Sequence, residues 1–207
     1  LSVYVHDGVS YVAYADTSDG YRAVVKKFQG GSKVPVTPVQ VGDVGETSVS
    51  FLSMKGDAAG NLYLVFESSP SDRIKVMKKP YASDTWSMVG DFVSPGRTYG
   101  PSLYLYEDGS GDATPYVAYA DAQSDYRPIV KKFVGDEWVT VGDDYVSEDD
   151  TWETSLYVDG DGTPYVAYVI GEGEYSRVFK LDNNSWVPVG GDGYASDGDS
   201  SGISLAV

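Results

Sequence analysis

The sequence contains one unit written four times, and this internal repeat constrains the fold more than any other feature. The run YVAYAD begins at Tyr11, and the same or related runs begin at Tyr63, Tyr116 and Tyr165. These four tyrosines recur every 49 to 53 residues. A fixed period of this size predicts a propeller, a solenoid or another array of stacked units.

Each unit contains four short apolar runs that are separated by turn-forming residues. In the fourth unit they cover residues 155–159, 164–169, 176–181 and 186–190, and the sequence DGDG at 159–162 predicts a tight hairpin turn between the first two. The runs are rich in Val, Tyr, Leu and Trp and show no helical spacing, so they predict strands. We therefore expect an all-β chain, a β-propeller of four four-stranded repeats forming one domain over residues 1–207.

The chain has one more first strand than it has complete repeats. The repeats cover approximately residues 1–47, 48–100, 101–153 and 154–200, and an extra strand is expected at 201–207. Three explanations are open: the chain is a piece of a longer propeller, the extra strand clasps the ring beside the first blade, or two chains combine into a larger ring. A fragment or a clasp is favoured over a dimer, because rings are normally completed within one chain.

Composition excludes several classes of partner. The net charge is −16 and the isoelectric point is about 4.2, which disfavours binding to nucleic acids or anionic membranes because like charges repel. No run of eighteen apolar residues occurs, so no membrane insertion is expected. The chain has no cysteine, which excludes disulfides and cysteine nucleophiles.

The repeat also carries a resemblance to known proteins. The pattern T-P-Y-V-A-Y, followed by V-K-K-F and W-V-x-V-G, resembles the repeat of tandem arrays in secreted and surface-attached bacterial proteins, which are similar to β-propellers such as the propeller lectins. The resemblance covers nearly the whole chain. It implies an extracellular or cell-surface location and a carbohydrate ligand.

Catalytic and metal motifs are sparse in the sequence. His6 is the only histidine, so neither a zinc site nor a Ser-His-Asp triad is expected. Aspartate-rich turns resemble fragments of calcium loops, but none has the full spacing, and tight turns use the same residues. We therefore predict no cofactor, with a weak calcium site as the alternative, in the turns that contain Asp108, Asp112, Asp159, Asp161, Asp197 and Asp199.

Strand polarity predicts that one rim of the propeller gathers the loops after the second and fourth strands. Carboxylates, arginines and aromatic rings in proximity suit a sugar, because hydroxyls need paired hydrogen bonds and C–H faces stack on rings. The alternative is structural: the repeated Tyr and Arg fasten neighbouring blades, with each Arg paired to the Asp of its own turn. The predicted ligand-binding residues are Asp16, Tyr21, Arg22, Tyr99, Asp121, Tyr126, Arg127, Trp152, Tyr175 and Arg177.

These observations favour a non-enzymatic, carbohydrate-binding module that recognises a glycan or surface polysaccharide, as a monomer or a dimer. The first alternative is a structural or adhesive repeat domain that binds protein partners. The second is a glycan-active hydrolase fragment, which the sequence does not exclude because 31 acidic residues are present. A carboxylate that breaks the repeat in an apolar setting would favour this second alternative.

Overall fold

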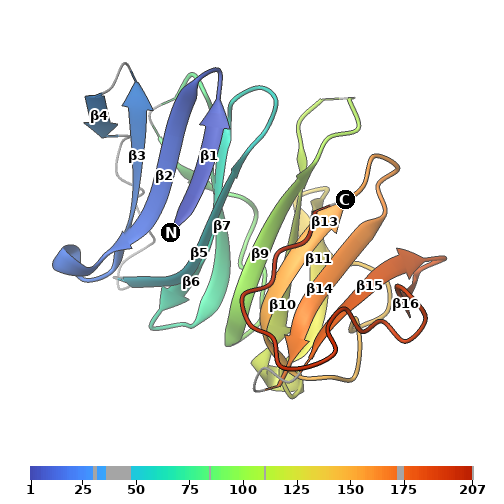
Figure 1. The fold of residues 1–207 in the computed structure, drawn as a ribbon. Helices are drawn as coiled ribbons and strands as arrows, with labels where there is room; N and C mark the ends of the chain where they lie inside the picture. Colours follow the sequence, from blue (N-terminus) through green and yellow to red (C-terminus); the bar gives the residue numbers. More distant parts are fainter. Residues whose placement is uncertain (30–31, 36–47, 84, 110, 172–174, 207) are drawn as a thin grey trace.

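The chain folds into four four-stranded antiparallel sheets, which confirms the predicted all-β propeller architecture (Figure 1). The computed structural model describes residues 1–29, 32–35, 48–83, 85–109, 111–171 and 175–206. Each sheet, or blade, uses its strands in chain order, and only two short 3-10 turns, η1 at Thr17–Asp19 and η2 at Ala122–Ser124, interrupt the strands within these ranges. In the same ranges no helix is long and apolar enough to cross a membrane.

The strands of the four blades follow the predicted repeats. Blade 1 contains β1 (Ser2–His6), β2 (Val9–Asp16), β3 (Arg22–Gln29) and β4 (Ser32–Pro35). Blade 2 contains β5 (Ser48–Gly56), β6 (Leu62–Ser69), β7 (Arg73–Lys79) and β8 (Ser87–Met88). Blade 3 contains β9 (Thr98–Tyr106), β10 (Thr114–Asp121), β11 (Arg127–Val134) and β12 (Glu137–Thr140). Blade 4 contains β13 (Thr151–Val158), β14 (Pro164–Ile170), β15 (Ser176–Asp182) and β16 (Ser185–Pro188).

The hydrophobic core lies between the blades rather than within one central layer. Strand alternation gives each blade two apolar faces, and the faces of adjacent blades pack against each other. Buried side chains form three clusters, one at each of the three junctions; the cluster at the junction of blades 3 and 4 includes Tyr116, Leu156, Val166, Tyr168 and Phe179. The blades therefore stack in a row, with blades 1 and 4 at opposite ends (Figure 1).

The first strands of blades 2, 3 and 4 each contain a β-bulge. In blade 4 the strand begins at Thr151, before the predicted run at 155–159. The pairing register shifts between Ser50 and Ser53, and equivalent shifts occur in β9 and β13. Gly100 lies in the β9 bulge with φ +56°, and a Cβ atom there would lie 2.4 Å from the carbonyl oxygen of Trp152. Only glycine permits this close approach of two blades.

The last described residues, 201–206, lie beside β13 in blade 4 and not beside blade 1 (Figure 1). They form no hydrogen-bonded strand pair. Of the three explanations for this segment, the clasp beside the first blade therefore does not agree with its position. β4 is the outer strand of blade 1. Pro38 and Glu46 lie outside the described residues.

Candidate functional site

Four aromatic rings from three blades meet on the predicted rim. We call Phe51, Tyr99, Tyr126 and Trp152 the aromatic platform. Ring centroids are 4.4 Å apart between Tyr126 and Trp152, 4.9 Å between Tyr99 and Trp152, 5.6 Å between Tyr99 and Tyr126, and 6.1 Å between Phe51 and Tyr99. Phe51 is 50% exposed and Trp152 is 41% exposed. The platform therefore offers a continuous aromatic surface to solvent.

Two residues of the platform have an unfavourable backbone conformation. Phe51 lies in the β5 bulge with φ 46°, and Tyr126 lies before β11 with φ 60°. A bulky residue in the left-handed region costs about 1–2 kcal/mol. Such costs concentrate at functional sites, so the rings at these positions are candidates for a role beyond the fold.

A buried carboxylate, Glu67, bonds the residues that precede two rings of the platform. It is 5% exposed, and it accepts hydrogen bonds from the hydroxyl groups of Ser50 (3.0 Å) and Thr98 (3.1 Å). These two residues precede Phe51 and Tyr99 in the chain, so Glu67 is tied to the backbone that carries both rings. Burial raises the pKa of Glu67 from its ordinary value of 4.5 to about 7, against the two hydrogen bonds, which lower it.

Glu67 breaks the repeat. The strand register places Ala15, Ala120 and Val169 at the equivalent position of the other blades. A carboxylate in place of a small apolar residue is the signal that would have favoured the hydrolase alternative. Neither Glu67 nor Phe51 is among the ligand-binding residues predicted from the sequence, because both lie within strands and not in the loops that were expected to form the rim.

A charged pair lies next to the platform. The Nε atom of Arg97 is 3.6 Å from a carboxylate oxygen of Asp72, and its guanidinium lies 5.0 Å from the centroid of the Tyr99 ring. Both side chains of the pair are about half exposed. The charge of Asp72 also contributes to the raised pKa of Glu67. A positively charged and a negatively charged side chain are thus both available for hydrogen bonding beside the exposed rings.

Arg127 does not pair with an aspartate of its own turn, as the structural alternative expected. Although Asp121 and Arg127 are partners in the register of β10 and β11, the Arg127 guanidinium lies 2.6 Å from the Glu148 carboxylate. Asp121 instead caps η2 by accepting hydrogen bonds from Gln123 and Ser124. In blade 1, by contrast, Asp16 caps η1 and Arg22 pairs with Asp19 of the same turn at 3.4 Å, as that alternative expected.

Arg127 lines a recess between blades 3 and 4. Charged side chains form much of its lining, whereas the platform is aromatic. The recess has a volume of about 480 Å³ and is also lined by Tyr145, Glu148 and Trp186. The Nε atom of Arg127 is buried without a hydrogen-bond partner, and its guanidinium lies 5.5 Å from the centre of the Tyr145 ring. An arginine, carboxylates and aromatic rings therefore meet in this recess, but of the predicted ligand-binding residues only Arg127 lines it.

The remaining predicted residues serve the junctions or lie at the two ends of the row. The carbonyl oxygens of Tyr21 and Tyr126 accept hydrogen bonds from the first strands of the next blades, at 2.8 and 2.9 Å, so these backbones fasten blades together. In blade 4, Arg177 donates to Asp149 at 2.7 Å and lies over the Tyr194 ring. The Tyr175 ring packs edge-on against that same tyrosine.

The aspartate-rich turn that contains Asp159 and Asp161 is the hairpin turn between β13 and β14. The carboxylate of Asp159 accepts hydrogen bonds from the backbone amides of Asp161 and Thr163. Within the described ranges, no three acidic or histidine side chains are grouped so that they could hold a metal ion.

Comparison with known proteins identifies the fold. No protein-family model matches the sequence, and no curated protein matches it. A mutant of AofleA from Arthrobotrys oligospora is similar over 98% of this chain and 57% of its own, with a TM-score of 0.65 and 12% identity. An exo-β-1,3-galactanase from Clostridium thermocellum is similar over 90% and 46%, with a TM-score of 0.58 and 12% identity. This chain thus spans about half the length of these two proteins.

Other similar structures belong to glycoside hydrolases. A GH43_1 enzyme from Xanthomonas citri has a TM-score of 0.54 at 13% identity, over 90% of this chain and 72% of its own. Such low identities establish the propeller fold alone. The hydrolases among the similar structures nevertheless contradict the prediction of a non-enzymatic binding module. They favour the alternative of a glycan-active hydrolase fragment, and they support a glycan as the partner.

Proposed function

We propose that this chain is the glycan-acting part of a glycoside hydrolase that cleaves β-linked oligosaccharides. The observation that carries the proposal is a buried carboxylate, Glu67, which breaks the repeat and accepts hydrogen bonds from the residues that precede two rings of the platform. The similar structures include an exo-β-1,3-galactanase with β-1,3-galactotriose and an enzyme complexed with xylotriose. Galactan and xylan fragments are therefore the first substrates to test.

The platform provides the binding surface in this proposal. Sugar rings stack their C–H faces on aromatic side chains, and such contacts contribute about 0.5–1.5 kcal/mol each. Trp152 and Phe51 are the most exposed rings of the platform, and Arg97 and Asp72 lie beside it to bond sugar hydroxyls. A chain of rings from three blades suits an oligosaccharide better than a single sugar.

Glu67 supplies the proton in this proposal. Its raised pKa keeps it partly protonated at neutral pH, as a general acid requires. Its proton passes to the glycosidic oxygen as the bond from that oxygen to the anomeric carbon breaks. Water adds to the anomeric carbon and loses a proton to the second carboxylate, for which Asp72 is the candidate. A substrate oxygen must first displace the hydroxyl of Ser50 or Thr98 from Glu67.

Product analysis tests this proposal. The full chain is incubated with β-1,3-galactotriose and, separately, with xylotriose, and released sugars are separated by chromatography. We expect product from at least one trisaccharide, a loss of release in Glu67→Gln and Asp72→Asn, and normal release in the control Glu137→Gln on exposed β12. No release by the unmodified chain, or normal release by Glu67→Gln, would reject the proposal.

Polysaccharides lie outside cells, so the extracellular location remains a prediction that fits the proposed function.

A further inference from the structure

Each blade has a forward face, which packs on the next blade, and a backward face, which packs on the preceding one. The register of the second and third strands defines equivalent forward positions in blades 2, 3 and 4. Hydrogen bonds that follow the third strands define two more. The amides of Val89, Val141 and Val189 donate to the carbonyl oxygens of Val76, Val130 and Val178, and the amides of Val93, Val146 and Ala195 donate to those of Ile74, Pro128 and Ser176. The repeats thus provide internal controls for burial at one place in the fold.

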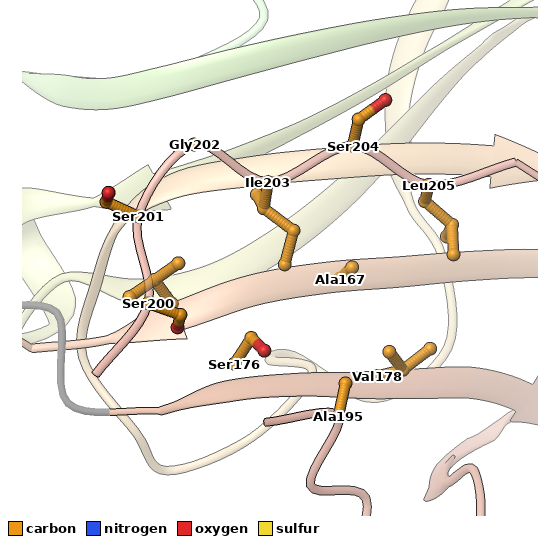
Figure 2. A pocket seen from close by; sticks show the side chains of 11 residues that line it. Ala167, Ser176, Val178, Ala195, Ser200, Ser201, Gly202, Ile203, Ser204 and Leu205 are labelled. Carbon is orange, nitrogen blue, oxygen red and sulfur yellow. The ribbon is translucent and has the colours of Figure 1, made fainter. Parts of the chain in front are cut away.

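The forward face of blade 4 lacks the cover that the other blades have. Val189 is 36% exposed, whereas its equivalents Val89 and Val141 are 8% and 5% exposed. Ala195 is exposed, whereas Val146 at the same place in blade 3 is 3% exposed. A groove of about 360 Å³ remains on this face, with a lining of mostly small and apolar residues that includes Ala167 and Val178 (Figure 2).

Residues 201–206 occupy part of this face in the manner of a first strand. The amide of Leu205 donates to the hydroxyl oxygen of Ser155 at 2.9 Å. The equivalent amides at two other junctions donate in the same way, from Met54 to Ser2 at 2.9 Å and from Leu156 to Ser102 at 3.1 Å. Figure 2 shows the side chains of Ile203 and Leu205 pointing toward the strand that carries Ala167.

The backward face of blade 1 is the matching half of this junction, and it also lacks a partner within the described part of the chain. Val3 and Val5 are both 57% exposed on β1. In blades 3 and 4 the residues equivalent to Val3 are Leu103 and Leu156, which are 1% and 4% exposed. The sequence Leu1-Ser2-Val3 corresponds to Ile203-Ser204-Leu205, so β1 and the C-terminal segment carry the same pattern of apolar and serine residues.

We propose that the forward face of blade 4 binds the backward face of blade 1 from a second copy of this chain, and that residues 201–206 act as a plug that competes for the same place. The contact continues the junctions already made between blades 1 and 2, 2 and 3, and 3 and 4. It joins different surfaces head to tail, so it generates either a ring or an open chain of copies. Burial of Val3, Val5 and Val189 provides its hydrophobic driving force.

Mass in solution tests the plug and the contact together. The full chain, a chain that lacks residues 201–207, and the same truncation with Val3→Asp are compared by light scattering over a hundredfold range of concentration. The truncated chain is expected to at least double its mass as concentration rises. The full chain should associate at least tenfold more weakly, and Val3→Asp should return the truncated chain to the mass of one copy.

A second variant separates loss of the plug from loss of the fold. Leu205→Asp in the full chain places a charge against the apolar face and releases the segment without shortening the chain. It should associate as the truncated chain does, with an unchanged circular dichroism spectrum. The proposal is overturned if the truncated chain keeps the mass of one copy. It is also overturned if adding Val3→Asp to the truncated chain leaves its association unchanged. Unfolding of both variants overturns it as well, because the segment would then be an integral part of blade 4.

Discussion

The burial of Glu67 predicts a pH-dependent stability that the substitution Glu67→Gln removes. The raised pKa of this carboxyl means that, between about pH 4.5 and pH 7, the folded protein holds a proton that the unfolded chain has lost. The contribution of this group to the free energy of unfolding is therefore fully present below about pH 4.5 and is lost as the pH rises through about 7. The difference between the two pKa values corresponds to about 3 kcal/mol.

Glutamine has the shape of the protonated carboxyl and can bond the same two hydroxyl groups. We expect Glu67→Gln to match the unmodified protein at about pH 4 and to exceed its stability by about 3 kcal/mol at about pH 8. The assay is urea unfolding followed by tryptophan fluorescence, and the quantity compared is the difference between variant and unmodified protein at each pH. Other titrating groups cancel in this difference.

The exposed substitution Glu137→Gln is the matched control, and its effect should not change with pH. A difference between Glu67→Gln and the unmodified protein that is constant across the pH range would refute the account of Glu67. A stability that rises from acid to neutral pH relative to Glu67→Gln would also refute it, because that sign requires a lowered pKa in the folded state.

Three further predictions use the repeat for their controls. Trp152→Ala should weaken trisaccharide binding about tenfold by removing a stacking ring, as measured by calorimetry, with unchanged melting. Tyr126→Gly and Tyr21→Gly both relieve a positive φ, and both keep the backbone hydrogen bond to the next blade. The melting temperature should therefore not fall in either variant, and only Tyr126→Gly should weaken trisaccharide binding. Arg177→Ala should lower the free energy of unfolding, measured in urea, by roughly 2–3 kcal/mol, because it removes the ion-pair partner of the partly buried Asp149 carboxylate. Arg22→Ala removes an exposed ion pair and should change the free energy of unfolding by less than about 0.5 kcal/mol.

The architecture was predictable because every unit repeats the same four alternating runs, and a repeat of that length has few ways to bury both faces of its sheet. Strand polarity then placed Tyr99, Tyr126 and Trp152 on one rim, and the structure brings these three rings into contact. The contacts themselves depend on β-bulges in the first strands, which alternation of residues does not reveal. The bulge places Trp152 within β13 and Phe51 beside Tyr99.

The charged groups were less predictable than the rings. A long arginine side chain chooses among all carboxylates within its reach, so the cross-strand register of Arg127 and Asp121 did not determine the ion pair with Glu148. Glu67 could have been found from the sequence, since a glutamate replaces alanine or valine at one position of the repeat. Its hydrogen bonds to Ser50 and Thr98 come from two blades and required the structure.

The most direct test of the proposed function is the rate of product release from the two trisaccharides as a function of pH. If Glu67 donates the proton, release should occur and its rate should fall as the pH rises through about 7, where this carboxyl loses its proton. Glu67→Gln should release no product at any pH while it still binds the trisaccharide. Binding without release by the unmodified chain at every pH would contradict the account.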